Sequence, residues 1–365
     1  MTDERRPGAT SPEGLAFTSY LRIVAIAAVV LIHVLPAIVG NDAIRGSRTW
    51  WLATILDIGA TWAVPAFVMV SGALILRPST ESTGAFFRRR LVRIGIPLVV
   101  AHLLYLAIRV FGRGDVLTAD TAIGEVLQAR TFTHLYFFWI VLGLYAITPI
   151  LRPFVAVSSQ RTIALAGIGF LTWMVAVSVA SELLRQLGLS SVPWQPAALT
   201  FFLPYIGYFM LGYAIRDRVL GPGALALAAV GFVAGMALVI IEYALDGASP
   251  GLALGFGGHY QGLPVAIATP CLYLVGRTVM DRAGILSRPE WSRTARWLGE
   301  LTLGVYVLHF AILIAVRRYV PALSFSETKD SLPLALVEWL LVVVLSFAAA
   351  AAIARVPVLR KAIGL

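Results

Sequence analysis

The chain has 365 residues, of which 59% are hydrophobic and 13% are charged. Soluble globular domains are about half apolar and about a quarter charged, so this composition excludes a soluble domain, a disordered chain and a coiled coil. The net charge of +10 comes from 29 Lys and Arg against 19 Asp and Glu, and the single cysteine, Cys271, excludes an internal disulfide. The composition indicates a protein that crosses a membrane several times.

Apolar segments follow one another along the chain and predict about ten transmembrane helices of about 20 residues each. The segments are 17–39, 50–76, 91–111, 132–151, 162–184, 199–215, 224–243, 260–279, 298–316 and 332–353. Helices are expected because isolated strands would leave backbone groups unpaired in hydrocarbon. The predicted fold is an all-α polytopic membrane protein. Residues 1–14 are expected to be a disordered cytoplasmic tail, 15–357 one transmembrane domain, and 358–365 a second short cytoplasmic tail.

The distribution of Lys and Arg predicts the orientation of the helices. If both termini are cytoplasmic, 19 of the 29 basic residues lie on the cytoplasmic side and 9 on the opposite side. We therefore expect both termini to be cytoplasmic and the protein to lie in a cell membrane, the bacterial inner membrane. The positive charge reflects this topology, and no basic domain or basic-aromatic pattern indicates a nucleic-acid partner.

Two ionisable residues, Arg22 and His33, lie within the first apolar segment. At about 100° and about 1.5 Å per residue, they share one helix face and stand about 16 Å apart. In a purely structural interpretation, the Arg22 side chain extends to the membrane interface and His33 forms a hydrogen bond to another helix. A histidine this deep on the same face favours a functional role instead. Asp57, at comparable depth in the second segment, is a candidate to orient the His33 ring.

Arginines gather where the third apolar segment begins, at Arg88, Arg89, Arg90 and Arg93. Such a cluster anchors a helix on the cytoplasmic side whatever else it does. Arg90 and Arg93 are three residues apart and are expected to share a helix face. Two guanidinium groups so placed suit an anionic, phosphate-bearing ligand from the cytoplasm, with Arg89 beside them.

Further polar and aromatic residues cluster near the outer ends of two segments. Residues 133–139 read Thr-His-Leu-Tyr-Phe-Phe-Trp, and residues 301–309 end on a second deep histidine, His309. An aromatic belt at the membrane interface explains most of the first cluster. The five histidines show no metal-ligand spacing, so no metal is expected, and neither a serine-hydrolase elbow nor a phosphate-binding loop is present.

Five motifs, taken together and in order, resemble the acyltransferase-3 family of integral-membrane acyltransferases. They are Arg22-x10-His33, Val64-Pro-Ala-Phe-Val-Met-Val-Ser-Gly72, Arg90-x-x-Arg93, His134-Leu-Tyr-Phe137 with Tyr145 and Pro149 beyond it, and Leu303-Gly-Val-Tyr-Val-Leu-His309. Within the family the chain is most similar to membrane O-acetyltransferases of surface polysaccharides, of the type that modifies enterobacterial common antigen. The resemblance covers nearly the whole chain after the N-terminal tail.

The chain departs from the family pattern at four positions. The family commonly has Asp three residues before the motif arginine and Gly directly after it, where this chain has Ser19 and Ile23. Tyr136 stands in place of a tryptophan and Thr302 in place of a serine. The first two changes fall beside Arg22 and concern the detail of donor binding.

The resemblance implies an acyltransferase that moves an acyl group, usually acetyl, from cytoplasmic acyl-CoA to a hydroxyl of a cell-envelope glycan or glycolipid on the outer side. With it, we expect His33 as general base, Arg22 as a further catalytic residue, and Arg90 and Arg93 as ligands of acetyl-CoA. Asp57, from its depth in the second segment, is also expected to be catalytic, and Arg89, from its place in the arginine cluster, to bind the donor. Membrane lipids, the acyl-CoA and the acceptor are the expected partners. The residues expected to contact the acceptor are Ser71, His134, Tyr136, Trp139, Tyr145, Tyr306 and His309.

Two alternatives remain open. A multi-span bundle with a buried arginine and histidine is also compatible with a transporter or flippase of an anionic or glycolipid substrate, although no internal repeat supports one. Some members of the family modify small molecules such as macrolides, and nothing in the sequence excludes such an acceptor. Consumption of acetyl-CoA separates an acyltransferase from a transporter, which leaves the thioester intact.

Overall fold

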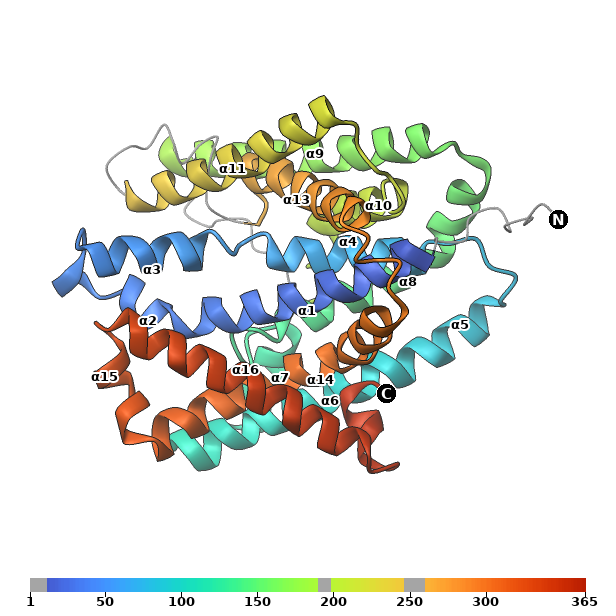
Figure 1. The fold of residues 1–365 in the computed structure, drawn as a ribbon. Coiled ribbons are helices and arrows are strands. Elements are labelled where there is room, and N and C mark those ends of the chain that lie inside the picture. Colours follow the sequence, from blue (N-terminus) through green and yellow to red (C-terminus); the bar gives the residue numbers. More distant parts are fainter. Residues whose placement is uncertain (1–11, 190–197, 246–259) are drawn as a thin grey trace.

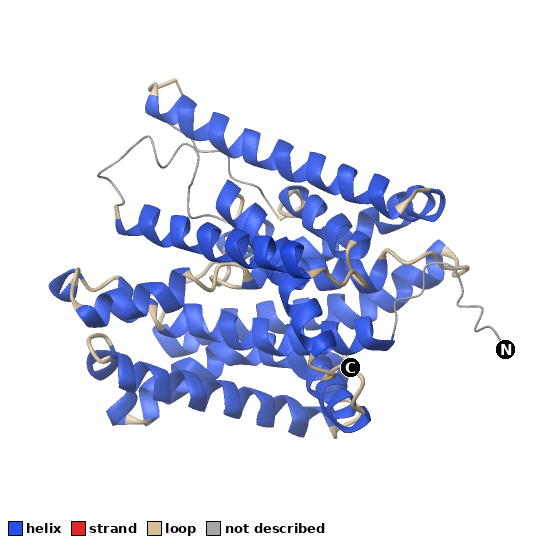
Figure 2. Ribbon diagram, turned by 45° about the horizontal axis from the view of Figure 1, so that its top comes forward, coloured by secondary structure: helices blue, strands red, loops and turns tan. Residues whose placement is uncertain are grey.

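The computed structural model describes residues 12–189, 198–245 and 260–365. Every regular element in these ranges is a helix (Figure 2), which confirms the all-α prediction. The elements are α1 (Pro12–Val34), α2 (Pro36–Val39), η1 (Asp42–Ile44), α3 (Arg48–Ile58), α4 (Ala63–Ile75), α5 (Thr83–Arg90), η2 (Leu91–Gly95), α6 (Ile96–Ala107), η3 (Ile108–Arg113), α7 (Ala119–Leu127), α8 (Tyr136–Val157), α9 (Gln160–Gln186), η4 (Leu203–Tyr205), α10 (Ile206–Ala214), α11 (Pro222–Ala244), α13 (Leu263–Arg282), α14 (Pro289–Tyr319), η5 (Pro321–Leu323), α15 (Phe325–Thr328), α16 (Leu332–Ala354) and η6 (Leu359–Ile363).

The helices run side by side through one bundle, with α1 near its centre (Figure 1). α1 packs against α4, α14 and α16. Over the described ranges, nine segments are long and apolar enough to cross a membrane. The protein is therefore a multi-pass membrane protein, as its composition predicts.

The predicted segment 199–215 differs from the other nine. It is helical only in the short turn η4 and in α10, whose nine residues extend about 14 Å. That length is about half the thickness of the hydrocarbon core. Residues 206–213 are all buried, so the high hydropathy of this segment reflects a position inside the protein.

Glycines allow α10 to pack in close contact with its neighbours. A Cβ added at Gly72 of α4 would lie 1.8 Å from the carbonyl oxygen of Phe209, and one at Gly212 would lie 2.0 Å from that of Met69. On the other side of α10, a Cβ at Gly207 would lie 2.7 Å from the carbonyl oxygen of Gly167 in α9. Small residues at such crossings are a common basis of helix packing in membranes. They fix the position of α4, which carries Ser71.

The second membrane-spanning segment is interrupted between α3 and α4. Residues 59–62 form a turn instead of helix, and a Cβ at Gly59 would lie 2.2 Å from the carbonyl oxygen of Ile55. Interrupted helices occur inside membranes where the irregular backbone lines a cavity. The interruption places Asp57 in the last turn of α3, within the bundle.

A buried ion pair holds the end of α1 that carries His33. Arg317 of α14 donates from Nε to Glu338 of α16 at 2.7 Å and from Nη2 to the carbonyl oxygen of Val34 at 3.2 Å. Glu338 is fully buried, and removal of one partner of such a pair is strongly destabilising. The arginine also satisfies one of the carbonyl groups left free at the C-terminus of α1.

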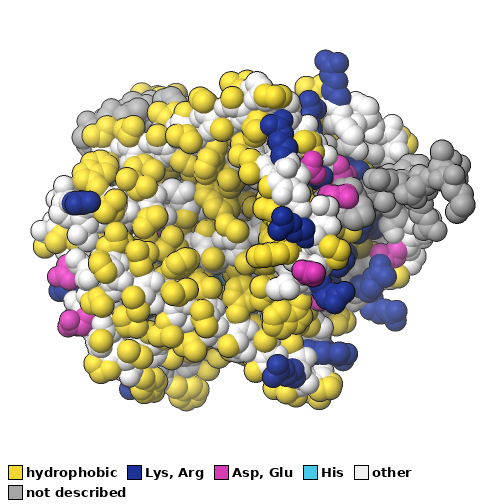
Figure 3. Space-filling view, in the orientation of Figure 1, with side chains coloured by type: hydrophobic (Ala, Val, Ile, Leu, Met, Phe, Trp, Pro, Cys, Tyr) yellow, Lys and Arg dark blue, Asp and Glu magenta, His cyan; other side chains and the backbone are white. Residues whose placement is uncertain are grey.

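α1 begins and α16 ends at the same end of the bundle (Figure 1). On the face drawn in Figure 3, most Lys and Arg side chains gather toward this end, beside a broad hydrophobic surface. Of the expected N-terminal tail, residues 1–11 lie outside the described residues, and α1 begins at Pro12. The expected C-terminal tail packs onto the bundle through η6, where Ile363 is buried.

Candidate active site

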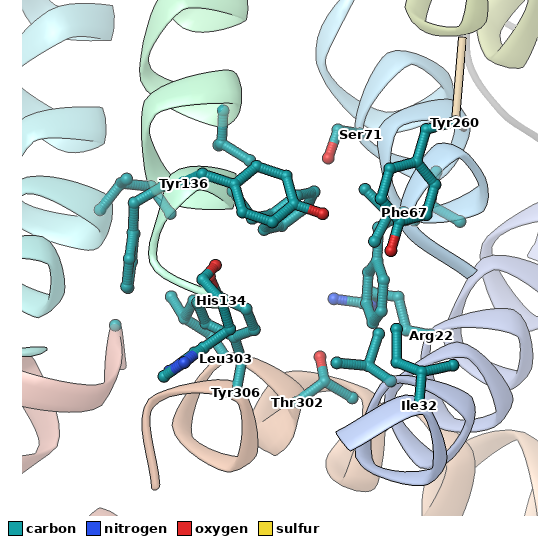
Figure 4. Close-up of a pocket in the computed structure, with 18 of the residues that line it drawn as sticks. Arg22, Ile32, Phe67, Ser71, His134, Tyr136, Tyr260, Thr302, Leu303 and Tyr306 are labelled. Atoms are coloured by element: carbon teal, nitrogen blue, oxygen red, sulfur yellow. The ribbon is translucent and has the colours of Figure 1, made fainter. Parts of the chain in front are cut away.

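A cavity of about 750 Å³ runs through the centre of the bundle. Its wall is formed by α1, the interrupted pair α3 and α4, the α5–η2 junction, α8 and α14 (Figure 4). Arg22 and His33 both line it, so one face of α1 forms a continuous part of the wall, as their spacing predicts. One end of the cavity is rich in arginines and the other in histidines and tyrosines.

The arginine end brings together Arg77, Arg90 and Arg93, with Glu300 of α14 in the same wall. The Arg90 guanidinium lies 5.4 Å from the ring centre of Phe86 and 5.3 Å from that of Tyr145, close enough for cation–π attraction. Its buried Nε has no hydrogen-bond partner. A cation that stacks on two rings is held in place while its hydrogen-bonding groups stay available to an anion.

Arg93 lies in η2, a π-helical turn directly after α5. Single π-helical turns are rare and are often found at functional sites. The C-terminal residues close this region, because a Cβ at Gly364 would lie 2.7 Å from the carbonyl oxygen of Arg93. Gly364 has φ of +77°, a left-handed conformation that favours glycine, and it lines the cavity.

Arg89 does not reach the cavity. It forms an ion pair with Glu81, and 63% of its side chain is exposed. With Arg88 it lines a separate pocket on the other side of the arginine cluster. Arg90 and Arg93 line both pockets, whereas Arg89 lines only the second one. Sequence spacing does not predict this difference.

Arg22 lies between the two ends of the cavity. Its Nη2 donates to the Ser19 hydroxyl at 3.3 Å, and its Nε to the Thr18 carbonyl oxygen at 3.4 Å. Ser19 occupies the place where the resembling family commonly has Asp, and it still supplies an acceptor. A Cβ at Gly299 of α14 would lie 3.2 Å from the same Nη2. The guanidinium is thus enclosed by the helices and projects into the cavity (Figure 4).

The opposite end contains three histidines from three helices or their flanks. The rings of His33 and His309 stack with centres 5.4 Å apart, and His134 lies 6.1 Å from His33 and 4.9 Å from His309. The Nδ1 of His309 lies 2.8 Å from the carbonyl oxygen of Tyr306. Since a carbonyl oxygen only accepts, Nδ1 carries the proton. His309 therefore stands behind His33 with a fixed ring orientation.

His134 faces the cavity and is 2% exposed. Neither of its ring nitrogens has a hydrogen-bond partner. Its backbone is fixed by the Tyr306 hydroxyl, which donates to the His134 carbonyl oxygen. Tyr105 packs edge-on against the ring with centres 4.7 Å apart. An oriented imidazole with free nitrogens is able to bind a polar ligand in the cavity.

Asp57 lines the same cavity and is 7% exposed. Among the described residues, no hydrogen bond joins its carboxylate to His33, whose ring neighbours are His134, His309 and Phe310. The role of Asp57 as the group that orients His33 therefore stays a prediction.

Most residues expected to contact the acceptor line the cavity, namely Ser71, His134, Tyr136, Tyr145 and Tyr306. Ser71 and Tyr136 project into it from opposite walls (Figure 4). Trp139 and His309 are not part of the wall. The Trp139 ring packs against His102 with centres 6.1 Å apart, and His309 lies behind His33. The cavity wall also contains residues that the sequence motifs did not indicate, namely Arg77, Tyr260, Glu300 and Gly364. For Arg77, its position directly after an apolar segment on the arginine side was an available signal.

In the part of the chain that the structure describes, no group of three or more His, Cys, Asp or Glu side chains is arranged to hold a metal ion. The three histidine rings stack and pack edge-on with their centres about 5 to 6 Å apart. The absence of a metal from the reaction stays a prediction.

A family model described as an acyltransferase domain, that of the acyltransferase-3 family, matches residues 15–355. The chain belongs to this family. This membrane acyltransferase therefore acts on an acyl donor and an acceptor, and the match supports an enzyme in preference to the transporter alternative. No curated protein and no solved structure matches the chain. The finer similarity to polysaccharide O-acetyltransferases rests on the sequence motifs alone.

Proposed function

We propose that this acyltransferase moves an acetyl group from cytoplasmic acetyl-CoA to a hydroxyl group of a cell-envelope glycan or glycolipid on the outer side of the membrane. The observation that carries the proposal is one cavity with arginines at one end and histidines at the other. The excess of Lys and Arg at the arginine end supports a cytoplasmic location for that end.

Coenzyme A is a polyanion with a long neutral arm that ends in the thioester. Arg90 and Arg93 supply paired guanidinium groups for its phosphates, and Arg77 adds a third cation to the same wall. Arg22 lies farther along the cavity on the path of the arm. The separation of about 16 Å between Arg22 and His33 along α1 suits a donor that enters at one end and reacts at the other.

In the proposed reaction, His33 accepts the proton of the acceptor hydroxyl as the oxygen attacks the thioester carbonyl carbon. A C–O bond forms and the C–S bond breaks, and the leaving thiolate takes the proton back from the imidazolium. His309 acts as a positioning residue, because its ring stacks on His33 and is itself hydrogen-bonded to the backbone. His134 and Tyr136 line the cavity beside this point, and we expect them to contact the acceptor.

A small-molecule acceptor remains the second candidate within the same chemistry. The cavity volume of about 750 Å³ is in the range of ligand pockets, so it has room for a small molecule as well as for the end of a glycan. The two candidates differ in the product that carries the transferred acetyl group, which is a glycan or glycolipid for the first and a small molecule for the second.

The decisive experiment uses purified enzyme in nanodiscs, acetyl-CoA labelled in the acetyl group, and two fractions from cells that lack the gene: an envelope fraction and a small-molecule extract. We expect release of free CoA thiol and label bound to glycan or glycolipid. Label in an extractable small molecule would favour the second candidate. Intact acetyl-CoA in the presence of both fractions would refute acyl transfer.

A further inference from the structure

The charges that line the cavity are separated by sign along its length. Arg77, Arg90 and Arg93 lie at one end, where Glu300 is the single acidic residue of the described wall, and Arg22 lies between the two ends. At the other end the single charged residue of the described wall is Asp57. A field that changes sign along a cavity selects ligands by charge at each end. The two substrates of the enzyme therefore meet opposite electrostatic environments.

Asp57 has no counter-ion in the described structure. Its carboxylate takes part in no ion pair there, and the residue is only 7% exposed. An ionisable group inside a membrane protein is costly unless it is paired or serves a ligand. The carboxylate reaches the cavity, and hydroxyl groups of a ligand are the donors that it lacks.

The surroundings of Asp57 are aromatic and bear hydroxyl groups. Tyr260 lines the same cavity as Asp57, and the centre of the Tyr136 ring lies 6.5 Å from that of Tyr260. Thr61, in the turn that interrupts the second span, lines the same part of the wall. Tyrosines offer an apolar face and a polar tip, so this end suits a ligand with both C–H faces and hydroxyl groups, as a sugar ring has.

We propose that Asp57 determines acceptor specificity: its carboxylate accepts hydrogen bonds from hydroxyls that flank the reacting one and excludes acceptors that carry a carboxylate or phosphate on that sugar. This inference rests on the proposed function and names its acceptor class as an uncharged sugar. A second anion beside an unpaired buried carboxylate is repelled strongly. We expect discrimination of at least about tenfold against anionic sugars.

The first test identifies the labelled sugar. Wild-type enzyme transfers labelled acetyl to the envelope fraction described above, and the product glycan is degraded under conditions that keep the ester. We expect the label on a neutral monosaccharide. Label on a uronic acid, a sialic acid or a phosphorylated sugar would overturn the role of Asp57 while the proposed acyl transfer would stand. Absence of label from every fraction would overturn both.

The second test separates acceptor binding from an action on His33. For Asp57→Asn we expect the acceptor KM to rise at least about tenfold, with the donor KM and the acceptor-free hydrolysis of acetyl-CoA unchanged. Hydrolysis uses water, which does not need the carboxylate for recognition. A fall in kcat and in hydrolysis at constant acceptor KM would mean that Asp57 acts through His33 and would overturn the proposal. Asp120→Asn, at an exposed carboxylate of α7, is the matched control and should leave all three values unchanged.

Discussion

The two ends of the cavity are built differently. At the arginine end, several cations gather in one wall; Arg90 is held by stacking on two rings, and Arg93 is exposed. At the histidine end, His134 and His309 are buried and His33 is partly buried, and neighbours from other helices fix their positions. Redundant charges suit a polyanion that must enter and leave, whereas a fixed geometry suits bond making. Substitutions at the arginine end should therefore change donor affinity, and those at the histidine end should change the rate.

The largest effect is expected for His33→Ala. Removal of a general base lowers kcat by roughly 10²- to 10⁴-fold, and the donor KM should stay close to that of the wild type because the arginines are untouched. Single-turnover transfer from labelled acetyl-CoA measures both. His102→Ala removes a histidine that lies outside the cavity wall and should retain activity. Full transfer by His33→Ala would remove this residue from the mechanism.

The next effect is expected for Arg90→Ala combined with Arg93→Ala. Loss of two charge-assisted contacts to phosphate should raise the donor KM by roughly 10- to 100-fold, with kcat changed less. Binding of a non-hydrolysable acyl-CoA analogue reports the same loss directly. Arg161→Ala combined with Arg218→Ala removes two exposed arginines and serves as the control. Equal losses in both double variants would reduce Arg90 and Arg93 to membrane anchors.

A smaller effect is expected at His309, which touches His33 without lining the cavity. His309→Ala removes the stacked ring and should lower kcat by roughly tenfold through loss of orientation. His309→Phe keeps a ring in the same place and should recover most of that loss, with an unchanged donor KM in both variants. A failure of phenylalanine to rescue would show that the imidazole takes part in proton transfer, which would contradict a purely positioning role.

The smallest effect is expected for Ser19→Ala. It removes the 3.3 Å contact to Arg22, and one hydrogen bond to a charged group contributes about 1.5–3 kcal/mol at most in buried sites. Because this contact is long, we expect the donor KM to rise only about two- to fivefold. Titration of the donor in the transfer assay measures it. A fall in kcat without a change in donor KM would place Arg22 with the histidines and not with the arginines.

The sequence predicted the parts of this arrangement that depend on local geometry. The regular spacing of Arg22 and His33 on one helix placed both in the cavity wall, and the apolar segments gave the spans. Segment 199–215 was predicted to span the membrane but contains only a short buried helix, because hydropathy does not distinguish lipid contact from burial in protein. The exclusion of Arg89 depends on its pairing with Glu81, and the contribution of Gly364 depends on how the C-terminal turn packs. Such contacts join residues far apart in sequence and leave no periodic signal.

The central claim is that the acetyl group crosses the membrane within this cavity, from the arginine end to the histidine end. Sealed vesicles from cells that produce the enzyme test it, because acetyl-CoA does not cross lipid. Labelled acetyl-CoA is added outside inside-out vesicles and, in parallel, outside right-side-out vesicles. We predict labelled glycan in the lumen of the inside-out vesicles and no transfer by the right-side-out ones. Transfer to glycan on the same side as the added acetyl-CoA would contradict the claim.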